Sequence, residues 1–174
     1  GRDTDMATRR EFLERSAFAA ALAGLAASRA AAGDGPPAPL SSDGHRPVVT
    51  PDGATLPFRV VDGVKVFHLI AEPVVREFAP GLNVNCWGYN GVTPGPTIEA
   101  VEGDRVRILE TNKLPEPTAI HWHGVLLPSG MDGVGGLSQR AIAPGETFRY
   151  EFTLRQHGTF MYHSHHDEMT QMAM

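Results

Sequence analysis

Cysteine is almost absent from this 174-residue chain, which contains only Cys86. A single cysteine excludes a disulfide framework within the chain and the cysteine-rich zinc sites that hold many small domains together. We expect Cys86 to lie on a strand, where its thiol acts as a small buried hydrophobic group. Aromatic residues are also few, at 7%, and the formal net charge is -5. The chain therefore lacks the basic balance that favours nucleic-acid binding, and no nucleic-acid partner is expected.

Glycine and proline, in contrast, are abundant, with 19 and 14 residues. This composition favours many turns and short strands over a helix bundle. Hydrophobic residues make up 41% of the chain, which is enough for a core and excludes disorder of the whole chain. The length predicts one domain with a tail. Eight histidines are present, and five of them lie in two short clusters.

The N-terminal segment 1–32 has the order of an export signal. Two arginines, Arg9 and Arg10, precede an apolar, alanine-rich run at 16–27, and small residues follow just before Gly33. A charged, an apolar and a small-residue region in this order are typical of a cleaved signal peptide, and the paired arginines resemble the twin-arginine type. The apolar run is shorter than the roughly 20 residues of a transmembrane helix, so no membrane span is expected.

This signal predicts a bacterial protein that is exported to the periplasm or secreted, with Met6 as the expected start. The segment that follows, 33–56, is expected to be a flexible linker because it is rich in proline and in small polar residues near its start. A short amphipathic or buried helix at 1–32 is the alternative interpretation.

The remainder, 57–174, is predicted to be all-β. In 147–154 the aromatic residues and the leucine alternate with polar residues, which predicts a strand with one buried face. A Pro-Gly pair before it and an Asp-Gly pair at 62–63 predict turns, the second of them in a two-residue hairpin. Several such strands at this spacing predict a sandwich or a barrel. The further strands are expected at 64–70, 97–101 and 105–111.

Two His-x-His pairs carry the chemistry, one in 120–124 (IHWHG) and one in 161–166 (MYHSHH). On a strand, side chains at i and i+2 point the same way and lie roughly 6 to 7 Å apart. Two such strands side by side would direct four imidazoles into one space, and this spacing suits neighbouring ions better than one ion held by each pair. Imidazole is a good ligand for copper, zinc, iron and nickel.

The histidine pairs belong to a longer ordered set of motifs, which resembles the first cupredoxin domain of the multicopper oxidases, a family that includes laccases and copper-tolerance oxidases. The resemblance covers about 58–174 and implies a cupredoxin-like Greek-key β-sandwich. The motifs, in chain order, are PGPTI at 94–98, EGD at 102–104, HWHG at 121–124, MDG at 131–133, PG at 144–145 and GTFMYHSH at 158–165.

The resemblance implies copper as the cofactor and assigns a role to each matching histidine. His121 would bind the type 2 copper, and His123, His163 and His165 would bind the type 3 pair. Oxygen would be reduced to water at this three-copper cluster while a phenolic compound or a reduced metal ion is oxidised. Asp132 matches an acidic residue that assists proton delivery in some members, although an aspartate that merely stabilises its turn is an equal alternative.

Trp122 and Tyr162 are expected to pack rather than to carry electrons, and the other histidines are expected to be bystanders: His45, His68, His157 and His166. The resemblance implies eight cluster histidines, of which this chain supplies four, so the others are expected from a later cupredoxin domain. A type 1 copper site needs a cysteine thiolate. Ser164 stands between His163 and His165, so we expect no electron-entry site in this domain.

We therefore expect 57–174 to be a first cupredoxin domain that lacks its last strand and is inactive alone, as part of a larger oxidase. Two alternatives stay open. One is a copper-binding cupredoxin-like domain without turnover. The other is a zinc hydrolase or lyase, which would need a third histidine and an open zinc position with bound water.

Overall fold

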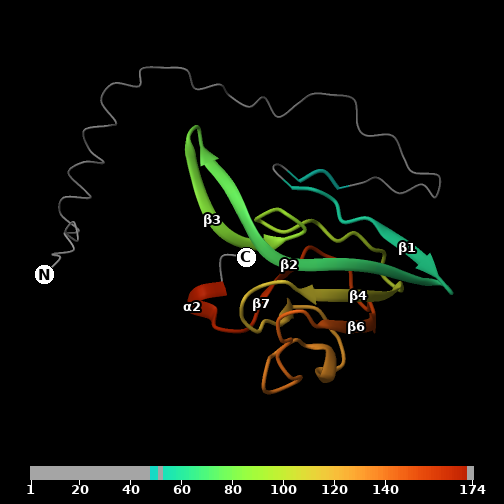
Figure 1. Ribbon diagram of the computed structural model, residues 1–174. Helices are drawn as coiled ribbons and strands as arrows, with labels where there is room; N and C mark the ends of the chain where they lie inside the picture. The colour runs from blue at the N-terminus through green and yellow to red at the C-terminus, as the bar shows by residue number, and fades with distance from the viewer. Residues whose placement is uncertain (1–47, 51–52, 172–174) are drawn as a thin grey trace, which may run out of the picture. The chain divides into compact units, whose positions relative to one another are not determined.

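The computed structural model describes residues 48–50 and 53–171, and these residues form two β-sheets (Figure 1). The predicted export signal and much of the predicted linker lie outside this range. The elements, in chain order, are β1 (Phe58–Val61), β2 (Val64–Ala79), β3 (Leu82–Tyr89), β4 (Arg105–Asn112), β5 (Ile120–His123), the 3-10 helix η1 (Ser129–Met131), β6 (Thr147–Thr153), β7 (Met161–Ser164) and α2 (Glu168–Gln171).

The larger sheet has the order β1-β2-β4-β6, and β3 pairs with the far half of β2. All of these pairings are antiparallel except β2 with β4, which run parallel from Lys65 with Val106 to Ala71 with Asn112. The second sheet contains only β5 and β7. The predicted all-β architecture is confirmed.

Several predicted elements are confirmed and two need correction. The strands at 147–154 and 105–111 are observed as β6 and β4. The Asp62-Gly63 hairpin turn is present, with φ of 50° and 76°. The strand predicted at 64–70 continues to Ala79 because β3 supplies a second partner along its far half. The strand predicted at 97–101 is not formed: its backbone pairs only through one isolated bridge between Thr97 and Thr55.

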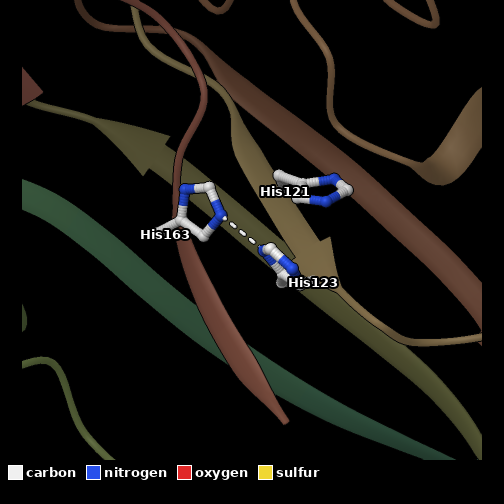
Figure 2. Close-up of side chains that lie close together, drawn as sticks. All are labelled: His121, His123 and His163. Carbon is white, nitrogen blue, oxygen red and sulfur yellow. Dashed lines mark hydrogen bonds between the residues drawn. The ribbon is translucent and has the colours of Figure 1, made fainter. Parts of the chain in front are cut away.

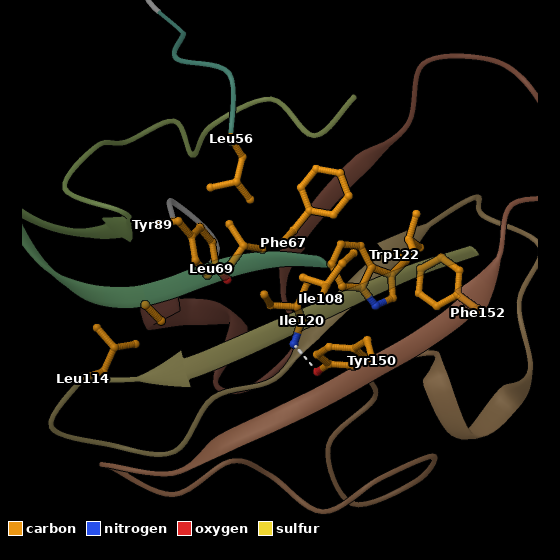
Figure 3. Close-up of a cluster of buried hydrophobic side chains, with 12 residues drawn as sticks. Leu56, Phe67, Leu69, Tyr89, Ile108, Leu114, Ile120, Trp122, Tyr150 and Phe152 are labelled. Atoms are coloured by element: carbon orange, nitrogen blue, oxygen red, sulfur yellow. Dashed lines mark hydrogen bonds between the residues drawn. The ribbon is translucent and has the colours of Figure 1, made fainter. Parts of the chain in front are cut away.

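The core fills the space on the inner faces of the two sheets (Figure 3). Phe67 and Leu69 of β2 and Tyr150 of β6 are fully buried, as the alternation along these strands requires. From the small sheet, Ile120 and Trp122 point into the same cluster. The small sheet is thus packed onto the large one by one face. Its other face carries the histidines.

Cys86 lies on β3 as expected, but its side chain is only partly buried. Its thiol donates to the Val84 carbonyl oxygen at 3.6 Å. Within 48–50 and 53–171, no helix is long and apolar enough to cross a bilayer.

Candidate metal centre

Three histidines of the two His-x-His pairs lie on the strands of the small sheet, His121 and His123 on β5 and His163 on β7. β5 and β7 run antiparallel with His121 opposite His163 and Trp122 opposite Tyr162. Because side chains alternate across a strand, the burial of Trp122 leaves its neighbours His121 and His123 on the other face. His165 follows directly after β7, and its backbone N–H donates to the Ala119 carbonyl oxygen at 2.8 Å.

The four imidazoles converge, as the spacing predicts. The ring of His121 lies 5.4 Å from those of His123 and His163 and 5.5 Å from that of His165, centre to centre. The His163 and His165 rings are 6.2 Å apart. Three of the residues, His121, His123 and His163, have ligand nitrogens that all lie within 4.8 Å of one another (Figure 2). These three can hold a metal ion between the strands.

One nitrogen of His121 is fixed by the turn that contains Asp132. The His121 Nδ1 atom lies 2.8 Å from the Asp132 backbone oxygen. A carbonyl oxygen only accepts hydrogen bonds, so Nδ1 carries the proton and Nε2 keeps its lone pair. An imidazole with one nitrogen held by a carbonyl in this way is the usual arrangement of a histidine metal ligand.

Gly133 makes this contact attainable. Its φ is +81°, a conformation that favours glycine, and an added Cβ would overlap the Ile120 carbonyl group. The turn after η1 therefore approaches β5 closely enough to bring the Asp132 oxygen onto His121. Sequence reading assigned the glycine to a turn but did not reveal this close approach to β5.

His123 and His163 face each other across the strands, with His123 Nδ1 3.3 Å from His163 Nε2. His163 Nδ1 donates to the Ser164 carbonyl oxygen at 2.9 Å, so its Nε2 carries the lone pair. Two nitrogens bonded at about 2.0 Å to one ion, at a near-tetrahedral angle, are about 3.3 Å apart. The pair therefore fits a first-row metal ion that replaces the shared proton.

The carboxylate of Asp132 is the predicted proton-relay group. Its Oδ1 lies 3.4 Å from His121 Nδ1, and its side chain is 35% exposed. The carboxylate thus lies between solvent and a cluster imidazole. The Asp132 backbone N–H donates to the Ser129 carbonyl oxygen at 3.1 Å, so the residue is also part of the turn that ends η1.

The predicted bystanders within the described range are not among the three residues whose ligand atoms lie close together, a group that also leaves out His165. His157 is 92% exposed and contacts Glu102 at 3.0 Å. His68 contacts the Thr111 hydroxyl at 2.8 Å on β2. His166 is partly buried after β7, outside the group of three close ligand atoms. His45 lies outside the described residues.

A buried glutamine fixes the serine between His163 and His165. The Gln171 side chain is fully buried, and its oxygen accepts from the Ser164 hydroxyl at 2.6 Å and the Thr118 hydroxyl at 2.8 Å. Its amide donates to the Pro117 carbonyl oxygen at 2.9 Å and to Glu116 Oε1 at 2.8 Å. Sequence reasoning did not identify Gln171, because nothing local marks it as buried.

Sequence reasoning also missed Glu110, a carboxylic acid in the core. It has no exposed surface, and this burial raises the pKa of Glu110 to about 8. The Tyr150 hydroxyl donates to its Oε2 at 3.3 Å, while its Oε1 has no partner. Burial also raises the pKa of Tyr150 well above its usual range. Glu110 occupies an inward position of β4, where an apolar residue is expected.

Comparison with known proteins gives a consistent set of relatives. The family model described as "Multicopper oxidase" matches residues 72–174. A copper resistance protein A homolog from Pseudomonas syringae pv. tomato (strain ATCC BAA-871 / DC3000) is 54% identical over 76 residues, which is 44% of this chain and 13% of the relative. An L-ascorbate oxidase from Cucurbita pepo var. melopepo is 51% identical over 105 residues, covering 58% of this chain and 19% of that protein.

The solved structures that the chain resembles are also multicopper oxidases. A multi-copper oxidase from Pseudomonas Thermotolerans is 45% identical with a TM-score of 0.58, covering 60% of this chain and 25% of that one. A multicopper oxidase from Campylobacter jejuni, titled a metallo-oxidase, is 33% identical with a TM-score of 0.61, covering 70% and 26%. The predicted cupredoxin-like fold is thereby confirmed. The matched stretch is a small part of these relatives, 13% of the copper resistance protein A homolog.

Proposed function

Because the chain belongs to the multicopper oxidase family, we propose that its four converging histidines supply half of the ligands of a trinuclear copper cluster. His121 binds the type 2 copper, and His123, His163 and His165 bind the type 3 pair. The remaining ligands come from a later cupredoxin domain of the full-length enzyme. Copper bound there supplies the reduction of O2 to water, with electrons taken from a phenolic compound or a reduced metal ion.

The observation that carries this proposal is the meeting of four imidazoles from β5, from β7 and from the residue after β7, with the His121 ring 5.4 to 5.5 Å from each of the other three. Neutral imidazoles add no charge, so a bound copper ion keeps its own positive charge and can still change its oxidation state. The fixed Nδ1–H of His121 and of His163 leaves an Nε2 lone pair on each ring for an ion. The family match favours copper over the zinc alternative, since imidazole alone does not distinguish the two metals.

In this proposal the Asp132 side chain delivers protons to the cluster, in addition to the backbone contact that orients His121. Its carboxylate oxygen, 3.4 Å from His121 Nδ1, is partly exposed and can take a proton from solvent. O2 reduction to water consumes protons, so a carboxylate beside the cluster can deliver them. The carboxylate would hold the proton at Oδ1, while the Asp132 backbone oxygen orients the His121 ring.

A copper-binding role without turnover is the alternative for this stretch of chain. The observation that favours it is the position of the single cysteine. Cys86 lies on β3 of the large sheet, away from the strands that carry the histidines. Ser164, between His163 and His165, offers no thiolate to copper. We expect the 174-residue chain to show no oxidation of a phenolic substrate, and turnover by the pure chain would contradict this expectation.

The test of the proposal is Cu(II) binding by the metal-free chain, followed by electron paramagnetic resonance and titration. His163→Gln should weaken binding by more than the roughly 10- to 100-fold that loss of an outer partner of a ligand costs. His157→Gln is the matched control, because His157 is exposed and bonded only to Glu102 in the described structure. Equal affinities of the two variants would contradict the proposal.

A further inference from the structure

The buried residues Tyr150 and Glu110 form a hydrogen-bond chain that ends on the strand carrying His121. The Ile120 backbone N–H donates to the Tyr150 hydroxyl oxygen at 3.1 Å (Figure 3). The Tyr150 hydroxyl donates in turn to Glu110 Oε2 at 3.3 Å. We infer that Tyr150, held by Glu110, is a positioning residue that sets where β5 presents His121 to a metal ion. This inference rests on the proposed copper site.

Tyr150 contacts β5 on both sides of His121. It holds the residue before His121 through the backbone hydrogen bond to Ile120. It contacts the residue after His121 through its ring, which meets Trp122 edge to face at a centroid distance of 5.2 Å. Both neighbours are buried. A shift of the Tyr150 side chain would therefore move the backbone that carries His121.

The bond to Ile120 is needed because that N–H is buried. A buried backbone N–H without an acceptor is costly, so nearly all find one. The Tyr150 hydroxyl is that acceptor. Since a hydroxyl can rotate, its direction is set by the group that accepts its own proton, and this group is Glu110 Oε2.

Glu110 makes its one hydrogen bond in the described structure to Tyr150. It shares the inward face of β4 with Val106, Ile108 and Asn112, all of them buried. The Asn112 amide is used fully: it donates to the carbonyl oxygens of Glu116 and Ile142 and accepts from the Leu114 N–H. Glu110 has one partner, Tyr150, and one buried oxygen without any. A buried carboxyl costs stability relative to an apolar residue, so its benefit lies in orienting Tyr150.

The experiment uses the full chain with Cu(II) alone as the probe. Tyr150→Phe should weaken Cu(II) binding by about 10-fold, change the electron paramagnetic resonance spectrum and speed hydrogen exchange of the Ile120 amide. Leu114→Val is the control, because it removes core volume in the loop after β4, and its affinity should stay within about twofold of the wild type. A folded Tyr150→Phe variant with unchanged affinity and spectrum overturns the inference.

A second pair of variants decides the question if Tyr150→Phe does not fold. Glu110→Gln keeps an acceptor for the Tyr150 hydroxyl and should keep the Cu(II) affinity within about twofold. Glu110→Leu removes the acceptor, leaves the buried Tyr150 hydroxyl unpaired and should lower the affinity several-fold. Equal Cu(II) affinities of folded Glu110→Leu and Glu110→Gln would overturn the inference.

The same variants separate this inference from the proposed function. If the wild-type chain binds no Cu(II), the proposed function fails. The positioning role is then read from the metal-free chain, in which Ile120 amide exchange should be faster in Glu110→Leu than in Glu110→Gln. Equal exchange rates would overturn the positioning role independently of any metal.

Discussion

The Nδ1 atom of His121 lies 2.8 Å from the backbone oxygen of Asp132, which places a turn 11 residues further along the chain directly against a predicted metal ligand. This contact decides which nitrogen of His121 faces the other imidazoles. It uses the backbone of Asp132, so substitution of that side chain leaves the acceptor in place. The contact instead depends on the glycine that follows.

Gly133→Ala should therefore lower the free energy of unfolding more than other glycine-to-alanine substitutions in turns do. The added Cβ overlaps the Ile120 carbonyl group, and φ is +81°. Gly136→Ala is a matched control, with φ of +82° and nothing near the added Cβ. The control should lose about 1–2 kcal/mol of unfolding free energy, and Gly133→Ala about 1–3 kcal/mol more. Urea denaturation measures both, and equal losses would contradict the close approach.

Glu110 should make the folded state less stable as the pH rises. Burial raises its pKa from 4.5 to about 8, so the folded chain holds the proton more tightly than the unfolded chain does. The unfolding free energy should then fall between these two pH values by about 1.4 kcal/mol per pH unit relative to Glu110→Gln. Tyr150 and Tyr89 stay neutral in this window, because burial raises the pKa of each. Parallel stability curves for the two proteins from pH 5 to 8 would contradict the prediction.

Gln171→Ala should loosen the segment between His163 and His165. The Ser164 and Thr118 hydroxyls would both lose the Gln171 oxygen in a buried position. They would keep only the longer contacts with each other at 3.3 Å and of Ser164 with the His166 carbonyl oxygen at 3.5 Å, and weakened pairing of buried hydroxyls should cost about 1–3 kcal/mol in total. Thr170→Ala, on the exposed side of α2, removes only a bond to Asp167 and should change stability by about 0.5 kcal/mol or less. Thermal unfolding compares the two, and similar midpoints would show that the network contributes little.

The predicted export route can be tested with Arg9→Lys and Arg10→Lys together. If 1–32 is a twin-arginine signal, the double variant keeps the charge but should abolish export, because the paired arginines are what the signal type requires. The measurement is the share of the protein in the periplasmic fraction of a bacterial host. Undiminished periplasmic delivery would indicate another route.

The convergence of the histidines followed from the sequence because it needs only period-two alternation and one pairing of two short strands. Trp122 and Ile120 are apolar and take the core face, which leaves the histidines for the other. The position of Glu110 did not follow, since the sequence does not reveal that the hydroxyl of Tyr150, which lies on the neighbouring strand β6 and pairs with Ile108, reaches the Glu110 carboxyl. The length of β2 was missed because its far half pairs with β3 rather than with β4.

The histidine strands make up a sheet of two strands with four residues each. A two-stranded ribbon of this size is marginally stable by itself. In the metal-free chain, β5 and β7 should therefore open locally more often than the large sheet does. An ion held between His123 and His163 would cross-link the two strands, and its binding free energy would add directly to the cost of that opening. The resistance of β5 and β7 to proteolysis would then increase in step with the fraction of the chain that holds a metal ion.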